Sequence, residues 1–234
     1  MKVELNGIPI FAGNFDDLMK TLYQRIKGDQ KTAVISANPE VLHYLISKNF
    51  KFDDEYIFIP DGIGTCLIVL VSKGKILKKI AGIDVFYEML RSSGKLNLKL
   101  FFLGARDEVI KRAYANAIDK FNAKVVGYNH GYFDSHEEET IVDKINLLSP
   151  DVLFVGLGCP KQEEFIDKYK DKLNVKLIVA VGGSFDVLAE RVKRAPRWMI
   201  SLGLEWLYRV MVEPVRIKRL KKVLIFVARS ILNF

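Results

Sequence analysis

The sequence of 234 residues predicts an α/β fold, with a mostly parallel β-sheet covered by helices on both faces. Short apolar runs rich in Val and Ile alternate along the chain with segments whose apolar residues recur every three or four positions. Gly or Pro directly follows several of these runs, which is typical of the turn between a strand and a helix. Half of the residues are hydrophobic, so the chain can bury a sizeable core.

The strands are expected in the short apolar runs, at Val3–Leu5, Thr32–Ser36, Tyr56–Ile59, Lys99–Leu103, Lys124–Tyr128, Val152–Gly156 and Lys176–Val181. Helices are expected between most of them, at Asp16–Ile26, Pro39–Lys48, Ile83–Ser92, Asp107–Phe121, His136–Leu147 and Pro160–Leu173. Asn38 followed by Pro39 indicates a capped helix start. The sequence contains no internal repeat and no low-complexity linker.

The net charge of +8 is concentrated at the C-terminal end. Residues 191–234 hold eleven Lys/Arg and two acidic residues, whereas the preceding 190 residues hold 25 basic and 26 acidic ones. This shift in charge predicts an α/β catalytic domain over residues 1–190 and a basic appendage over residues 191–234. The appendage is expected to meet an anionic partner.

The appendage also carries an apolar stripe with helical spacing, made of Ile217, Leu220, Leu224, Val227, Ile231 and Phe234. A basic amphipathic helix with a wide apolar face suits an anionic membrane surface better than nucleic acid, where the apolar face would stay wet. The alternatives are that the helix docks on the protein's own core or against a second copy in a homo-oligomer.

No run in the sequence approaches the roughly 20 apolar residues that cross a bilayer, and the N-terminus lacks the apolar segment of a signal peptide. The two cysteines, Cys66 and Cys159, have no metal-ligand spacing, and free thiols fit a reducing compartment. We therefore expect a cytoplasmic protein that binds peripherally to the inner face of the cell membrane.

Polar residues follow several of the predicted strands. Asp61 comes directly after an apolar strand in the sequence IPDGIG, a position suited to a general base, although an Asx turn before a helix explains it equally well. Ser36 and Asn38 end the second strand in SANPE. Asn38 is explained as a helix cap, and the amides beside it also favour a phosphate or hydroxyl ligand.

Two further strand ends carry candidate binding residues. Gly182 and Gly183 allow a ligand close to the backbone, and Asp186 can hydrogen-bond a sugar hydroxyl, unless this is only a tight turn with a helix cap. Gln162 lies in the first turn of a helix, where an amide has no structural reason to be, so it is assigned to ligand contact. A first-turn Glu163 is explained as a complement to the helix dipole.

No metal or other cofactor is predicted. The acidic pairs Asp16-Asp17 and Asp53-Asp54 lack the Asp-x-Asp spacing, and the three histidines have no paired spacing. The turn Gly104-Ala105-Arg106 resembles the start of a nucleotide-binding unit but lacks the full glycine pattern of a dinucleotide site.

The motifs PDGIG, Gly82-Ile83-Asp84, FFLGA, VVGYNHGYF, VGLGCPKQE, VGGSFDVLA, RAPRW, GLEWLYR and EPVR occur in this order, and together they resemble the WecG/TagA/CpsF glycosyltransferases. The resemblance covers nearly the whole chain. It implies a Rossmann-like domain with a basic C-terminal appendage that helps to complete the site at the membrane. It also implies metal-independent transfer of a sugar, most often N-acetylmannosamine, from a UDP-sugar. The acceptor would be undecaprenyl-diphosphate-linked N-acetylglucosamine, in teichoic acid or other cell-surface polymer synthesis.

The resemblance also implies roles for single residues. Asp61 resembles the family's catalytic base and Gln162 its active-site glutamine, while Tyr132 and Asp186 resemble residues that line the nucleotide-sugar pocket. Three positions depart from the family pattern. Ser36 replaces the usual Thr, Lys79 the usual Arg, and Glu190 the usual Gly. Lysine keeps the charge of arginine but loses the fork that grips phosphate.

The chemistry of an inverting transfer needs these parts. Asp61 would take the proton of the acceptor hydroxyl. The departing diphosphate would be held by Lys79, the helix N-terminus near Gln162, and Arg216 and Arg219 of the appendage. The rival hypotheses are an NAD-dependent Rossmann oxidoreductase, which would need a complete glycine fingerprint, and a membrane-surface module without enzyme activity.

Overall fold

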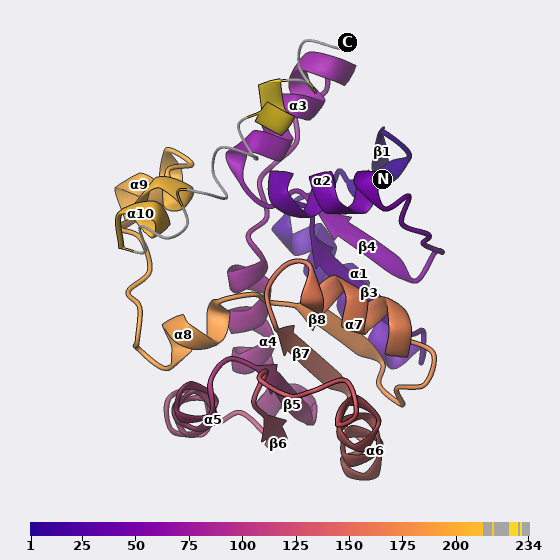
Figure 1. Cartoon of the computed structure of the whole chain (residues 1–234), viewed down its shortest axis with the longest axis vertical. Coiled ribbons are helices and arrows are strands. Elements are labelled where there is room, and N and C mark those ends of the chain that lie inside the picture. The colour runs from indigo at the N-terminus through magenta and orange to yellow at the C-terminus, as the bar shows by residue number, and fades with distance from the viewer. Residues whose placement is uncertain (213–216, 218–224, 229, 231–234) are drawn as a thin grey trace.

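A sheet of eight strands forms the centre of the molecule (Figure 1). The computed structural model describes residues 1–212, 217, 225–228 and 230, and within them the strand order is β1-β2-β4-β3-β8-β7-β5-β6. Only β1 is antiparallel to its neighbour among these strands. The bounds are β1 Lys2–Leu5, β2 Ile8–Phe11, β3 Thr32–Ser36, β4 Tyr56–Ile59, β5 Leu100–Gly104, β6 Val125–Asn129, β7 Val152–Gly156 and β8 Leu177–Ala180.

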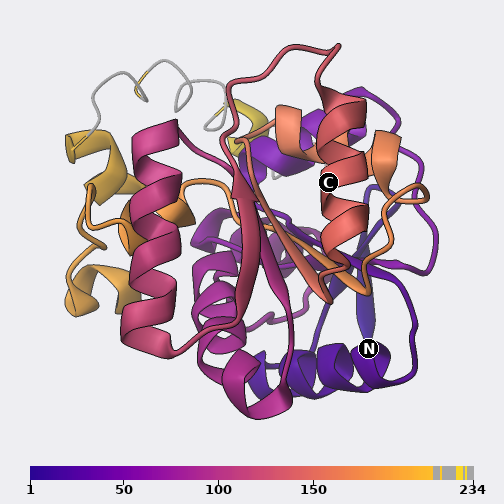
Figure 2. The ribbon, with the colours of Figure 1, turned by 90° about the horizontal axis from the view of Figure 1, so that it is seen from below.

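Helices cover both faces of this sheet, as predicted (Figure 2). One apolar cluster joins the sheet to α2 (Pro39–Ser47), α3 (Ile63–Lys73), α6 (Glu138–Leu148) and α7 (Lys161–Tyr169). The other joins it to α1 (Phe15–Lys27), α4 (Gly82–Leu96), α5 (Asp107–Phe121) and α8 (Ser184–Leu188). The mostly parallel α/β fold expected from the sequence is thereby confirmed.

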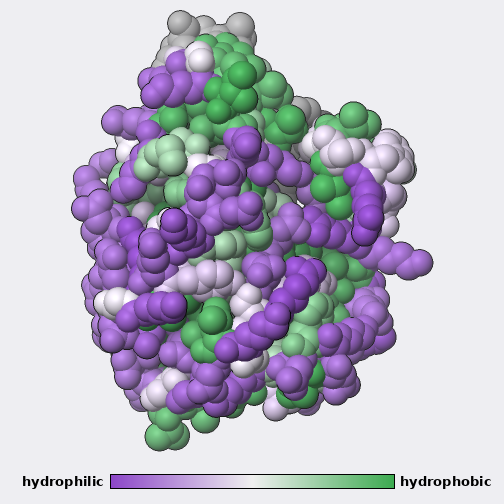
Figure 3. Space-filling view, turned by 180° about the vertical axis from the view of Figure 1, so that it is seen from behind, coloured by the Kyte–Doolittle hydropathy of each residue, from purple (hydrophilic) through white to green (hydrophobic). Residues whose placement is uncertain are grey.

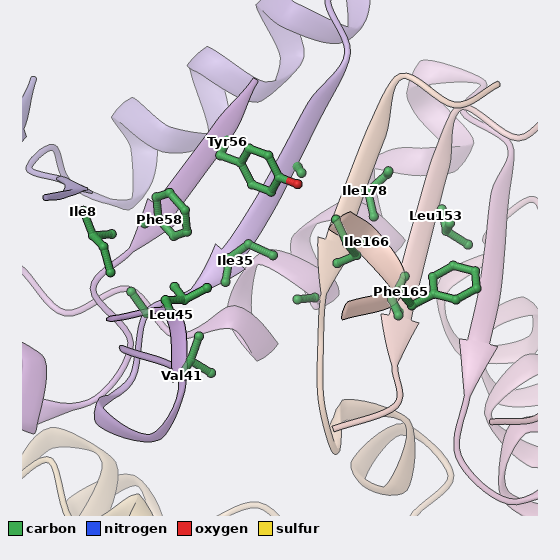
Figure 4. Packing of buried hydrophobic residues seen from close by; sticks show 14 of the residues in the cluster. Ile8, Ile35, Val41, Leu45, Tyr56, Phe58, Leu153, Phe165, Ile166 and Ile178 are labelled. Carbon is green, nitrogen blue, oxygen red and sulfur yellow. The ribbon is translucent and has the colours of Figure 1, made fainter. Parts of the chain in front are cut away.

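Alternating residues of each buried strand divide between the two clusters, because successive side chains point to opposite faces. In β3, Ile35 belongs to the first cluster and Val34 to the second. Figure 4 shows the first cluster, where Ile35 and Phe58 of the sheet face Val41 and Leu45 of α2. This packing fixes the first turn of α2 against the carboxyl ends of β3 and β4.

The helix starts follow local sequence signals. Asn14 and Asp17 form a reciprocal capping box at the start of α1. The side chain of Asn38 accepts hydrogen bonds from the backbone N–H groups of Glu40 and Val41, with Pro39 in the first turn. The predicted cap at Asn38 is confirmed.

The structure adds elements that the sequence interpretation left out. Strand β2 pairs with β1 through a turn at Asn6-Gly7, where both residues have positive φ. Helix α3 follows Asp61, and two short helices, α9 (Arg197–Ser201) and α10 (Glu205–Val212), open the basic appendage.

The first part of the appendage is fastened to the α/β layers by ion pairs. The guanidinium of Arg194 lies 2.6 Å from Asp84 of α4, and the ammonium of Lys79 lies 3.1 Å from Glu205 of α10. The backbone at Gly203 packs against Ile63, the first residue of α3. Residues 191–212 therefore dock on α3 and α4, while the predicted boundary after residue 190 stays a prediction.

The predicted apolar stripe lies mostly outside the described residues, since of its six members only Ile217 and Val227 are described. Ile217 is half exposed. Val227 and its neighbour Phe226 pack against the cluster beneath α2 and α3, with the Phe226 ring edge-on to His43 at 5.4 Å. For this short segment the structure shows docking on the protein's own core.

Candidate active site

Four adjacent strands bring the predicted site residues to one edge of the sheet. These strands are β4, β3, β8 and β7, in their order in the sheet. Strand β4 ends just before Asp61, and β3 ends at Ser36. Strand β8 ends before Gly182, and β7 ends before the loop that leads to Gln162. The paired registers Ser36–Ile59 and Val155–Ala180 keep these ends level. This is the carboxyl edge of a parallel sheet, where α/β proteins bind their ligands.

Asp61 is held at this edge from two sides. Its Oδ2 accepts the backbone N–H of Gly82 at 3.1 Å, and the Ser36 hydroxyl also bonds to the carboxyl group. Among the described residues no side chain caps the start of helix α3, which follows, so Asp61 does not serve as a cap for it. The carboxylate is oriented by distant parts of the chain rather than by a local turn.

The surroundings of Asp61 favour its protonated form. Burial raises the pKa of the carboxyl above its ordinary value, and the negative charge of Glu205 adds to the shift. The Gly82 N–H, the Ser36 hydroxyl and the positive charge of Arg209 oppose it. A carboxyl that binds protons more readily than usual is suited to accept one from a hydroxyl.

Gln162 is buried at the edge and both ends of its carboxamide are bonded. The Oε1 atom accepts the backbone N–H of Gly182 at 3.1 Å, and the Nε2 atom donates to Glu163 Oε1 at 2.8 Å. Burial raises the pKa of Glu163 to about 7, against the hydrogen bonds from Gln162, its own backbone and Cys159. Glu163 lies in the first turn of α7, as predicted, but its side chain is enclosed, which a complement to the helix dipole does not require.

A pocket opens beside this cluster, between the α8 turn and the appendage. Its lining includes Gly183, Asp186, Arg194, Tyr208 and Arg209. The position that a Cβ on Gly183 would take lies 3.8 Å from both Arg209 Nη1 and Asp186 Oδ2, so the absence of a side chain opens this space. Arg209 thus lies against the turn at Gly183, and its positive charge acts on the Asp61 carboxyl group.

Comparisons with known proteins identify the family of this chain. The sequence profile of the family described as "Glycosyl transferase WecG/TagA/CpsF family" matches residues 3–233. The chain belongs to this family.

Two of its relatives carry the same name, "N-acetylglucosaminyldiphosphoundecaprenol N-acetyl-beta-D-mannosaminyltransferase". The one from Bacillus subtilis strain 168 is 36% identical over 222 residues, which cover 92% of this chain and 86% of the relative. The one from Staphylococcus aureus strain NCTC 8325 is 34% identical over 197 residues, which cover 82% and 77% respectively. The chain is therefore a glycosyltransferase, which decides between the hypotheses raised by the sequence.

The structure shows what Lys79, one of the three departures from the family pattern, contacts. The ammonium group bonds to Glu205 at 3.1 Å and to the carbonyl of Ile200 at 3.4 Å. Lys79 therefore joins the connection before α4 to the appendage, and its predicted phosphate contact stays a prediction. Ser36 keeps the hydroxyl expected at its position and uses it on Asp61.

Two of the remaining predicted site residues, Asp186 and Tyr132, lie within the described part of the chain. Asp186 pairs with Arg191 at 2.6 Å on the pocket wall. Tyr132 lies beyond the end of β6 and is 71% exposed, so its role in the nucleotide-sugar pocket stays a prediction. Arg216 and Arg219 lie outside the described residues. Among the described residues, no group of three or more His, Cys, Asp or Glu could hold a metal ion.

Arg209 is the functional candidate that sequence reasoning missed. Its signal was present, because it ends the motif GLEWLYR that helped to identify the family. The structure shows that the first part of the basic appendage supplies a wall of the pocket.

Proposed function

We propose that this glycosyltransferase moves N-acetylmannosamine from its UDP derivative to undecaprenyl-diphosphate-linked N-acetylglucosamine, with inversion, in teichoic acid or related cell-wall synthesis. The names of the 34–36% identical relatives support the sugar and the acceptor. The observation that carries the proposal is the setting of Asp61, oriented by Gly82 and Ser36 beside a pocket with a cationic wall.

The reaction is a direct displacement in which Asp61 acts as the base. As the acceptor hydroxyl oxygen bonds to the anomeric carbon, its proton passes to the Asp61 carboxylate. The bond from the anomeric carbon to the UDP phosphate oxygen breaks, and UDP leaves with that electron pair. Arg209 is positioned to stabilise the charge that develops on the diphosphate, since guanidinium groups bind phosphate oxygens well. Ser36 holds the carboxylate in place through its hydroxyl.

A lipid-linked acceptor requires that the site meets a membrane, and we propose that the protein binds the anionic inner surface of the cell membrane. The support is a group of exposed apolar side chains that we call the apolar rim: Ile63, Leu67, Leu70 and Val71 of α3, and Trp198, Leu202, Trp206 and Met211 of the appendage and its helices. Their exposed fractions run from 38% to 69%, although such residues are usually buried.

The apolar rim lies next to the candidate site. Ile63 follows Asp61 by two residues and contacts the backbone at Gly203, which joins the α3 part of the rim to the α9–α10 part. Figure 3 shows hydrophobic surface gathered over α3 at one end of the molecule, with a second group over α9 and α10. Tryptophans beside an apolar face are typical of proteins that sit in the membrane interface. None of the described helices is long and apolar enough to cross a membrane.

The test of the proposed reaction is turnover of UDP-N-acetylmannosamine with a short-chain polyprenyl-diphosphate-N-acetylglucosamine, followed by mass spectrometry and compared with a panel of other UDP-sugars. Asp61→Asn should lower turnover by roughly two to four orders of magnitude, the usual contribution of a positioned base. Calorimetry should show little change in UDP affinity, because the carboxylate acts on the acceptor.

The matched control is Asp119→Asn, which neutralises an exposed carboxylate on α5 away from the sheet edge. It should keep the turnover of the unaltered protein. Near-normal turnover in Asp61→Asn would remove the role of base from Asp61. Transfer from a different UDP-sugar alone would overturn the choice of N-acetylmannosamine.

A further inference from the structure

Glu163 has a buried carboxyl group that the reaction described above does not use. The side chain is fully enclosed in the first turn of α7. Its Oε1 accepts the Nε2 hydrogen bond of Gln162, and the Cys159 thiol and the Glu163 backbone also bond to the carboxyl group. Within the described part of the chain no hydrogen-bond partner faces Oε2. Enclosing such a carboxyl group costs folding free energy, so fold stability alone does not explain its presence.

Compensation of the helix dipole does not explain the burial either. Glu164 occupies the same first turn and is exposed to solvent. A carboxylate at that position complements the positive end of the helix without a desolvation cost. The enclosed position of Glu163 therefore needs a reason connected with the group that it contacts.

That group is the carboxamide of Gln162, which can point in two ways that are nearly equal in shape. An ionised carboxylate only accepts hydrogen bonds, so it can meet the NH₂ end of the carboxamide and not the oxygen. The oxygen is then turned to the Gly182 N–H, where the structure has it at 3.1 Å. Gly182 has a left-handed backbone with φ 48°, and it begins the turn at Gly183 that opens the pocket.

We propose that Glu163 is a positioning residue for sugar transfer, whose carboxylate fixes the orientation of the Gln162 carboxamide and, through it, the Gly182-Gly183 turn at the donor pocket. This inference rests on the proposed function, because it takes Gln162 and that turn to belong to the working site. No contact between Glu163 and the substrate is implied.

The orientation depends on the charge of Glu163, so it responds to pH. Burial raises its pKa to about 7, with the nearby Glu40 of α2 adding to the shift. The hydrogen bonds from Gln162, its own backbone and the Cys159 thiol act in the opposite direction. Burial raises the pKa of the Tyr44 hydroxyl on α2, and the charges of Glu164 and Glu163 add to that shift. Protonation makes one oxygen a donor, so the preference for the NH₂ end is lost as the pH falls through about 7.

The experiment compares the full-length protein with Glu163→Gln and, as matched control, Glu164→Gln. Turnover and KM for UDP-N-acetylmannosamine are measured from pH 5.5 to 8.5 with a water-soluble acceptor analogue. Glutamine keeps the shape but can turn either end to Gln162. We expect turnover at pH 8 to fall about ten- to a hundredfold, as for a small misplacement of reacting groups. Glu164→Gln should stay within about twofold, because that side chain is exposed and bonds to Tyr44 rather than to Gln162.

Three readouts separate positioning from a structural role. The decline of turnover near pH 7 should disappear in Glu163→Gln. The melting temperature of this variant at pH 8 should equal or exceed that of the unaltered protein, because an enclosed charge has been removed. In a Gln162→Ala background the same substitution should change turnover by less than about twofold, since the group it acts on is gone.

Unaltered turnover in Glu163→Gln would overturn the inference. So would a loss of activity that follows a loss of melting temperature, or an equal loss in the Gln162→Ala background. If Glu163→Gln does not fold, Glu163→Asp, which keeps the charge but withdraws it by one methylene, replaces it with the same expected loss of turnover. Failure of the unaltered protein to transfer any UDP-sugar would overturn the proposed function and this inference with it. Transfer by that protein with normal variants overturns the inference alone.

Discussion

The Asp61 carboxylate, the proposed base, depends on a position that carries no side chain. A Cβ on Gly82 would lie 2.3 Å from Ser36 Oγ and 3.5 Å from Asp61 Oδ2. Contacts below 3 Å force neighbouring groups apart, and here both neighbours belong to the site. Glycine therefore allows the serine hydroxyl, the aspartate and the start of α4 to meet in one small volume.

This close approach leads to a prediction for Gly82→Ala. The added methyl group should displace the Ser36 hydroxyl and the carboxylate, and turnover should fall at least about tenfold while the protein stays folded. The control is Gly28→Ala, at the end of α1, where φ is −86° and the nearest atom to an added Cβ is the Gln24 carbonyl at 3.4 Å. Turnover and melting temperature of both variants give the answer. Equal turnover in the two would mean that the contact relaxes at no cost.

The sequence predicts some of these residues and not others for a definite reason. Asp61 and Gln162 are recognisable because each follows a strand and has a side chain suited to chemistry. Gly82 appears in the sequence only as part of a motif, since its tight contact with Ser36 joins positions far apart in the chain. The burial of Glu163 could not be predicted, because the local sequence shows that it starts a helix but not that its side chain is enclosed.

Among the elements, α10 matters because it supplies Arg209 to the pocket and Glu205 to Lys79. Both partners of the Lys79–Glu205 pair are about four-fifths buried. Removing one charge of such a pair leaves the other enclosed without compensation, which is more costly than losing a surface pair. Arg194, 3.5 Å from Glu205, supplies a second and longer contact.

The pair leads to a prediction for Lys79. Lys79→Ala should lower turnover roughly tenfold, equivalent to about 1.4 kcal/mol, because only the longer contact with Arg194 then balances the charge of Glu205 and α10 is less firmly docked. Lys79→Arg should keep or improve turnover, since it retains the charge. Lys78→Ala is the control, an exposed lysine of the same connection. Normal turnover in Lys79→Ala would show that this ion pair does not support the site.

Sequence patterns alone did not predict helix α3 or strand β2. A surface helix is usually recognised by its polar face, but in α3 exposed apolar side chains of the apolar rim occupy that face. The segment is therefore one apolar run in the sequence, without a helical pattern. Strand β2 was not predicted, although the Asn6-Gly7 turn before it is a strong hairpin signal. The order of the strands depends on long-range packing that no local pattern contains.

At the scale of the whole molecule, the proposed reaction requires that the sheet edge and the apolar rim bring a soluble donor and a lipid-linked acceptor together. The pocket lies between the α8 turn and the appendage, and the rim starts two residues after Asp61. In the sequence, residues 191–234 carry eleven basic and two acidic side chains. Apolar insertion and attraction to anionic headgroups act in the same direction in this arrangement.

This arrangement predicts how the protein binds vesicles. The double variant Leu67→Glu/Val71→Glu adds two charges to the exposed face of α3 and should strongly reduce co-sedimentation with anionic phosphatidylglycerol vesicles. Its turnover with a water-soluble acceptor should stay normal, because neither side chain is part of the pocket. Leu147→Glu is the control, an 85% exposed leucine on α6 outside the rim, and it should bind vesicles normally.

Removal of the residues after Glu213 separates the contribution of the basic tail. Each basic residue near an anionic surface adds about 1 kcal/mol of attraction, so the shortened protein should lose vesicle binding most completely at low salt. It should also lose transfer to the soluble acceptor if Arg216 and Arg219 act on the donor, whereas the α3 variant should keep that transfer.

If the α3 variant binds vesicles like the unaltered protein but no longer self-associates in sedimentation experiments, the apolar rim joins two copies rather than meeting lipid. If the shortened protein binds vesicles and transfers sugar normally, the membrane role of the tail is wrong, and α3 with the docked part of the appendage is sufficient.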